Sequence, residues 1–132
     1  MSQFGSQLHG KSARKLNGSG KVKIRSRDKR RHEMGGYFTA TRLGAEDERK
    51  DSRGRGGNVK KKLMYSAFAN LLTQSGYKKA KIKAITESKD NRNFARLNII
   101  TKGAVIETEL GKAVVTNRPG REGLINAKLI EK

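Results

Sequence analysis

Residues 98–127 have the sequence NIITKGAVIETELGKAVVTNRPGREGLINA, and this stretch decides the fold that we expect for the chain. Apolar runs rich in Ile, Val and Thr cover residues 98–101, 104–110, 113–117 and 124–130, and turn residues separate them. Short runs of this composition, punctuated by glycine, predict β-strands joined by tight turns. Side chains alternate between the two faces of a strand, so one face of residues 104–110 can be buried while the other remains exposed to solvent. The face predicted to be buried carries Ala104, Ile106, Thr108 and Leu110.

The strand pattern continues upstream of this stretch. In residues 78–86 (KKAKIKAIT) the alternation places Ala80, Ile82 and Ala84 inside, and Lys79, Lys81 and Lys83 outside. Residues 37–43 (YFTATRL) also alternate, and 73–77 contain a Ser-Gly pair typical of a hairpin turn. A one-face row of lysines either protects a sheet edge or offers a phosphate-binding surface, and the sequence leaves both open.

Residues 59–72 (VKKKLMYSAFANLL) fit two structures. Their apolar positions recur at helical spacing, and they also alternate as in a strand. Periodicity alone favours a helix here. The three lysines at 60–62 would add positive charge beside either element.

The remaining segments predict loops and turns. Residues 45–58 (AEDERKDSRGRGGN) are expected to form a charged loop, in which Glu46, Asp47 and Glu48 are solvated rather than metal-binding because their order does not match a calcium loop. Its glycines permit positive φ and a close approach of backbone to a phosphate chain. Residues 87–96 predict one short helical turn capped by Ser88 or Asp90, and Pro119-Gly120 predicts a tight turn.

Charge dominates the composition of the 132-residue chain, which is long enough for one domain and a long tail. The 31 basic and 12 acidic residues give a net charge of +19, and only 33% of residues are hydrophobic. This imbalance predicts a polyanionic partner, and nucleic acid fits best because the basic region has no helical apolar face for a membrane. The chain has no cysteine, no apolar run of membrane-spanning length and no apolar signal core.

The basic excess is greatest in residues 11–31 (KSARKLNGSGKVKIRSRDKRR), where ten residues are basic and one is acidic. Only Val22 and Ile24 are β-branched and apolar there, too few to anchor the segment to a core. We expect an arm that is extended or disordered alone and that grips phosphates through its arginines and lysines. The competing interpretation is a solvated tail or a localisation signal.

Catalytic chemistry is not predicted. There is no cysteine nucleophile and no G-x-S-x-G motif. His9 and His32 resemble an acid–base pair in residue type only, because nothing in the sequence holds them at a fixed separation. Glu107 and Glu109 are better explained as solvent-facing, or as partners of Lys112 and Arg118. The expectation is a protein that is not an enzyme and has no metal site.

Several segments resemble one known family in the same order along the chain. They are RDKRRHEMG (27–35), RGGN (55–58), NIITKGAVIETELGKAVVTNRPG (98–120) and GLINAKLIE (123–131), together with the basic N-terminal stretch. The chain resembles the small-subunit ribosomal protein eight of the archaeal and eukaryotic type over roughly residues 11–131. One departure is the Leu16-Asn17-Gly18-Ser19-Gly20 segment, where the family usually has a Thr-Gly-Gly-like turn; we still expect a loop there.

The resemblance carries further expectations. It implies a long strand rather than a helix at 59–72. It also implies a structural role in the small ribosomal subunit, where the protein would bind and stabilise ribosomal RNA without a cofactor. Neighbouring ribosomal proteins would be further partners. We expect no membrane partner, a cytoplasmic location in the ribosome and a monomer when free. The alternative is a free-standing nucleic-acid-binding module, such as an RNA chaperone or a chromatin-type protein, which would bind duplex DNA comparably at matched salt.

The predicted fold is all-β. We expect a small barrel or sandwich of about six to seven mostly antiparallel strands from residues 32–132, with an extended basic arm at 1–31. The residues predicted to bind RNA are Arg14, Lys15, Lys21, Lys23, Arg25, Arg27, Lys29, Arg30, Arg31, Arg53, Arg55, Gly56, Gly57, Asn58, Lys60, Lys61 and Lys62.

Overall fold

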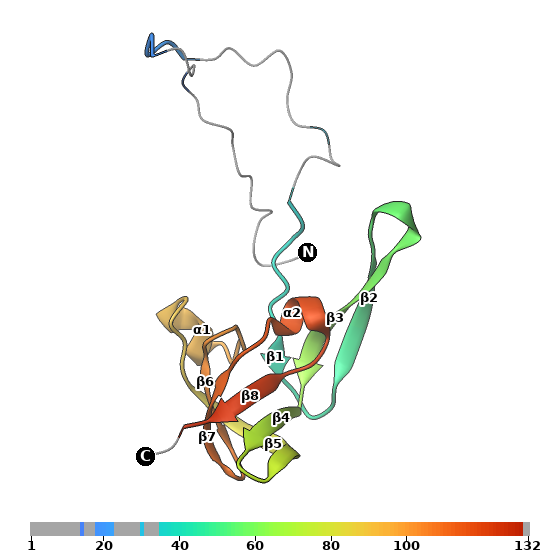
Figure 1. Cartoon of the computed structure of the whole chain (residues 1–132), viewed down its shortest axis with the longest axis vertical. Helices are drawn as coiled ribbons and strands as arrows, with labels where there is room; N and C mark the ends of the chain where they lie inside the picture. The colour runs from blue at the N-terminus through green and yellow to red at the C-terminus, as the bar shows by residue number, and fades with distance from the viewer. Residues whose placement is uncertain (1–13, 15–17, 23–29, 31–34, 131–132) are drawn as a thin grey trace. The chain divides into compact units, whose positions relative to one another are not determined.

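A closed five-stranded barrel is the main element of the computed structural model, which describes residues 14, 18–22, 30 and 35–130 (Figure 1). Its strands are β4 (Phe68–Thr73), β5 (Gly76–Glu87), β6 (Val105–Thr108), β7 (Gly111–Val115) and β8 (Asn126–Leu129). Neighbouring strands pair antiparallel, except that β8 closes the barrel by pairing parallel to β4. The predicted all-β barrel is therefore confirmed.

A three-stranded sheet accompanies the barrel. Its order is β1 (Arg42–Leu43), β3 (Val59–Ser66) and β2 (Glu48–Arg53), so that β2 lies at an edge. β1 runs parallel to β3, and β2 runs antiparallel to it. A short 3-10 turn, η2 (Arg55–Gly57), joins β2 to β3 at the tip of their hairpin. Figure 1 shows that tip, in green, extending away from the barrel.

Residues 59–72 are extended, as the resemblance implied and against the helical spacing of their apolar residues. They form two strands rather than one, because Ala67 separates β3 from β4. β3 belongs to the sheet and β4 to the barrel, so this segment links both. A strand also suits the environment: Leu63 and Leu71 are fully buried, whereas Val59 and Leu72 are exposed.

The core lies inside the barrel and under the sheet. Leu63, Leu71, Ile106, Val115 and Ile125 belong to one cluster and are each at most 2% exposed. Alanines complete the interior on four of the five strands: Ala69, Ala80, Ala113 and Ala127. Small barrels fill their interiors with alternating small and large side chains, and these alanines leave room for the isoleucines and leucines.

The predicted alternation fails at two places where the backbone departs from a regular strand. In β5 the register shifts between Ile82 and Ala84, so Ala84 is exposed and Ile85 is buried instead. A bulge inserts an extra residue and reverses the faces beyond it. In 104–110, Ala104, Ile106 and Thr108 are buried as predicted, but Leu110 is half-exposed because the hairpin turn comes at residues 109–110, before Gly111.

Other segment boundaries also differ from the sequence predictions. Residues 45–58 are not a loop throughout, because β2 begins at Glu48. Residues 98–101 form no strand: Ile99 makes only an isolated bridge to Arg42, and Asn98 has a φ of 53°. Within 37–43, only Arg42–Leu43 is assigned to a named strand.

The two α-helices of the described residues are short. α1 (Arg92–Arg96) confirms the predicted helical turn, but Asn91 caps it rather than Ser88 or Asp90: the Asn93 amide donates to Asn91 Oδ1 at 2.9 Å. Pro119 begins α2 (Pro119–Glu122) instead of a tight turn, and the helix ends at Gly123 with a φ of 74°. Neither helix is long enough to cross a membrane.

Contacts divide the chain into two units, residues 1–38 and 39–132, which are described separately. In the first, Arg14 and Val22 form an isolated antiparallel bridge. Gly18 and Gly20 lie between them with φ values of 75° and 68°. The described part of this segment is thus a loop, as expected. The division into an arm at 1–31 and a β domain at 32–132 stays a prediction.

Candidate nucleic-acid interface

The β2–β3 hairpin concentrates positive charge. Residues 48–62 contain seven basic and two acidic side chains. Strand register places Lys50 directly opposite Lys62 and Ser52 opposite Lys60, so the three lysines share one face. On the other face, Lys61 lies opposite Asp51. Like charges directly opposite one another are destabilising, so a bound polyanion would relieve an electrostatic cost built into this face.

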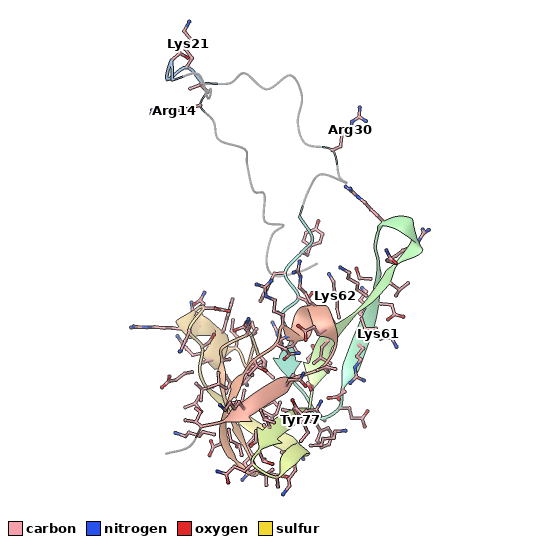
Figure 2. The ribbon with its side chains drawn as sticks, in the orientation of Figure 1. Arg14, Lys21, Arg30, Lys61, Lys62 and Tyr77 are labelled. Carbon is pink, nitrogen blue, oxygen red and sulfur yellow. The ribbon has the colours of Figure 1, made fainter. Side chains whose placement is uncertain are left out.

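The lysines of β3 have no fixed partner among the described residues. Lys60 and Lys61 are exposed and Lys62 is half-buried. In the described part of the chain, no carboxylate forms an ion pair with any of the three. Figure 2 labels Lys61 and Lys62 on β3. Their ammonium groups are therefore available to phosphate oxygens as point charges.

The hairpin tip combines arginine with glycine. Gly56 and Gly57 have φ values of 68° and 77°, as the sequence predicted for a sharp turn. Two hydrogen bonds hold this turn: Asn58 Nδ2 donates to the Arg55 carbonyl at 3.1 Å, and the Gly54 amide donates to the Asn58 carbonyl at 2.6 Å. Residues 53–58 are all exposed. A turn without side chains at two positions lets its backbone approach a phosphate chain closely.

Two polar contacts fix the base of the hairpin. Arg49 Nε donates to the Gly123 carbonyl at 2.7 Å, and Arg49 Nη2 pairs with Asp47 Oδ2 at 3.2 Å. These contacts tie β2 to the end of α2, so Arg49 is a structural residue despite its charge. A Cβ on Gly123 would lie 3.2 Å from the Lys61 carbonyl oxygen, which shows how closely α2 approaches β3.

Asp47 is part of the same anchor at the base of the hairpin. The prediction that the acidic cluster of Glu46, Asp47 and Glu48 is merely solvated is therefore wrong for Asp47. Its Oδ1 accepts hydrogen bonds from Ser66 Oγ at 2.8 Å and from the Ala67 amide at 3.0 Å. Burial disfavours the ionised carboxylate, but these hydrogen bonds and the nearby Arg49 outweigh it and lower the pKa of Asp47 below its ordinary value of 3.8. Asp47 thus ties the start of β2 to the junction of β3 and β4.

The predicted RNA-binding residues fall into three groups. The structure brings Arg53, Arg55, Gly56, Gly57, Asn58, Lys60, Lys61 and Lys62 together on one hairpin. Arg14, Lys21 and Arg30 belong to the other unit, whose position relative to the hairpin is not determined. The remaining arm residues lie outside the described residues: Lys15, Lys23, Arg25, Arg27, Lys29 and Arg31.

Sequence reasoning missed Lys50 and the anchor at the base of the hairpin. Lys50 cannot be assigned to a strand face from the sequence, because β2 (ERKDSR) has no alternation of apolar residues that would predict a strand. Arg49 and Gly123 are 74 residues apart, and no local pattern connects them. Within the described residues, no group of three His, Cys, Asp or Glu side chains is placed to hold a metal ion.

Comparison with known proteins decides the family. The sequence model of a family described as "Ribosomal protein S8e" matches residues 8–130. The chain belongs to the ribosomal protein S8e family. It is 47% identical to "Small ribosomal subunit protein eS8" of Ignicoccus hospitalis, over 94% of this chain and 96% of that protein. It is 48% identical to the protein of the same name from Hyperthermus butylicus, over 94% of this chain and 92% of that protein. The S8e family is the one that the sequence motifs resembled.

Proposed function

We propose that this S8e-family chain is a structural constituent of the small ribosomal subunit that binds ribosomal RNA through its basic arm and the β2–β3 hairpin. Family membership over almost the whole chain carries the proposal, because two relatives with 47% and 48% identity are named as small-subunit ribosomal proteins. The hairpin supplies a physical means: its β3 lysines form no ion pair with any described residue, and an arginine–glycine tip lies at its end.

The hairpin suits RNA that is recognised by shape and backbone charge. Its lysines and arginines contribute affinity by releasing counterions from phosphates, which carries no sequence information. Its fixed geometry, set by Arg49 and Asp47 at the base, contributes register. Double-stranded RNA is largely recognised through such shape and backbone contacts. Neighbouring ribosomal proteins are proposed as further partners on the family assignment alone.

Sedimentation of the tagged chain in native cell extract tests the role. We expect it to migrate with small ribosomal subunits and to be released by ribonuclease. A chain that stays at the top of the gradient, or that follows DNA, would contradict the ribosomal role. The free-standing nucleic-acid-binding module would then account for the basic surfaces.

The arm is tested separately by salt dependence. Changing Arg27, Arg30 and Arg31 to Ala should reduce the slope of log affinity against log salt by up to about 0.9 for each phosphate that is no longer neutralised on a duplex, or nearer 0.7 on single strands. A matched variant with Lys102, Lys112 and Arg118 changed to Ala removes the same charge elsewhere. An unchanged slope in the arm variant would exclude those three side chains from the interface.

A further inference from the structure

Three of the exposed large hydrophobic side chains lie on a second hairpin, β4–β5. Phe68 and Leu72 are on β4 and are 37% and 40% exposed, and Tyr77 on β5 is 75% exposed. Register places Leu72 directly opposite Tyr77, and Phe68 opposite Lys81. Ala69 and Leu71 on β4 and Ala80 on β5 point into the core instead. The exposed set therefore lies on the outer face of the barrel.

Lysines interleave with these apolar side chains. On β5, Lys79 and Lys81 follow Tyr77 at alternate positions, and Lys128 on β8 lies opposite Leu72. β4 and β8 contain no acidic residue, and the one acid of β5, Glu87, is at its far end. We call the set Phe68, Leu72, Tyr77, Lys79, Lys81 and Lys128 the barrel platform. Its charge repels a second copy of the chain and the basic arm alike, and favours a polyanion.

The two aromatic rings of the platform differ in what they offer. The Lys79 ammonium lies over the Phe68 ring, 4.4 Å from its centroid, so one face of Phe68 is already engaged. The Tyr77 side chain makes no hydrogen bond or ring contact within the described part of the chain. Figure 2 labels Tyr77 on this hairpin. The Tyr77 ring is thus an exposed aromatic surface that contacts none of the described residues through a hydrogen bond or a ring contact. Lys79 and Lys81 follow it two and four residues later on the same strand face.

We propose that the barrel platform holds an unpaired nucleotide segment of RNA, with a base stacked on Tyr77 and flanking phosphates at Lys79, Lys81 and Lys128. Single-stranded nucleic acids are held by this combination of an aromatic surface and a positive track. An acidic protein segment matches the charge but offers no flat π face to an exposed ring. The inference rests on the proposed RNA-binding function and assigns it a second site, separate in sequence and chemistry from the β2–β3 hairpin.

The test compares three RNAs with one helical stem. One has a blunt end, one carries a short oligouridine tail, and one carries a tail of abasic nucleotides with the same number of phosphates. The full chain should bind the oligouridine-tailed stem more tightly than either of the others. Tyr77→Ala should weaken binding to the oligouridine tail by roughly tenfold, and should leave binding to the blunt stem unchanged. Tyr77→Phe, which keeps the ring, should retain the affinity.

A fluorescence readout adds a second measurement. The chain has no tryptophan, so Tyr77→Trp introduces a single indole at the platform. Its emission should be quenched by the oligouridine tail and not by the abasic tail. Equal binding of the three RNAs by the wild-type chain, or tail binding unchanged in Tyr77→Ala, would overturn the platform. Tyr77-dependent binding of a labelled glutamate-rich peptide, with tail binding unchanged, would overturn it in favour of a protein partner.

The outcomes separate this inference from the proposed function. If the platform alone is wrong, the chain still binds the blunt stem, and changing Lys60, Lys61 and Lys62 to Ala still weakens that binding. If the proposed function is wrong, the chain binds none of the RNAs more tightly than a DNA duplex of equal length at the same salt.

Discussion

The two lysine-rich hairpins of this chain place the same residue type in different surroundings. On β2–β3, Lys50 lies opposite Lys62, and no exposed aromatic ring alternates with the lysines on that face. On β4–β5, Lys81 lies opposite Phe68, and Lys79 covers the Phe68 ring. A lysine-rich strand can present positive charge alone or positive charge beside an aromatic ring. Which of the two it presents depends on the residues that lie opposite the lysines on the neighbouring strand. The first suits a phosphate backbone and the second suits an unpaired base.

The hairpins also differ in how they are supported. β4 and β5 each pair with a further strand of the closed barrel. β2, in contrast, is an edge strand of the sheet, and its exposed residues are mostly charged. Charged edge strands also prevent pairing between sheets of different molecules. The basic residues of β2 would serve that purpose even in a protein that bound no RNA.

Leu63→Ala should be the most damaging change to the β2–β3 hairpin. Leu63 is fully buried in the same cluster as the barrel residues, so its truncation leaves a cavity beneath the sheet. We expect a decrease of about 2–5 kcal/mol in the free energy of unfolding, measured by chemical denaturation. Val59→Ala, on the exposed part of the same strand, should cost about 0.5 kcal/mol or less. Equal decreases would show that the hairpin folds without the barrel core.

Changing Lys60, Lys61 and Lys62 to Ala should have the largest effect on RNA binding. On a blunt RNA stem, leaving three phosphates without their lysines reduces the slope of log affinity against log salt by up to about 2.7, at 0.9 for each phosphate. The matched variant changes Lys79, Lys81 and Lys83 to Ala on the other hairpin. If both triple variants lower the slope equally, binding depends on net charge alone, and the distinction between the hairpins fails.

Sequence alone predicts the local features of both regions well. The strands and buried faces of residues 104–108 follow from the alternation of Ala104, Ile106 and Thr108, because one buried face imposes a period of two. The basic tip at 53–58 follows from residue type and glycine content. Each of these properties is determined by neighbours in the chain.

The failures involve contacts that a local pattern does not contain. β2 is a strand because its backbone pairs with β3, and its own sequence has no apolar face. A bulge in β5 exchanges Ala84 and Ile85 between the outside and the core. Sequence alone places Tyr77 only in a turn, because its exposure and its position opposite Leu72 depend on strand register. The residues of the barrel platform can therefore be recognised as one surface only from the pairing of the strands.

Asp47 gives the base of the β2–β3 hairpin a dependence on pH. Its pKa in the folded chain is lower than in the unfolded chain, so its contribution to stability is complete above the ordinary value of 3.8 and is lost as the pH falls through the lower folded value. Asp47→Asn should remove this part of the acid dependence. The measurement is the free energy of unfolding at several pH values on both sides of 3.8. Parallel curves for the two proteins would contradict the assignment.

The smallest expected effect concerns Lys79 on the barrel platform. Its ammonium lies over the Phe68 ring, and an exposed cation–π contact is worth about 0.5–1 kcal/mol. Lys79→Met should therefore lower the free energy of unfolding by about that amount, and should cost almost nothing in a Phe68→Leu background, where no ring quadrupole remains. Lys83→Met, on the same strand but away from the ring, is the matched control.

This double-mutant cycle sharpens the contrast between the two hairpins. A positive coupling energy for Lys79 and Phe68 means that the folded chain already holds this lysine in place, so less rotamer entropy is lost when it meets a phosphate. Lys60–Lys62 have no such restraint from the described residues and must lose that entropy on binding. A coupling energy near zero would make the lysines of both hairpins equally mobile. Tyr77 would then be the feature that distinguishes the barrel platform.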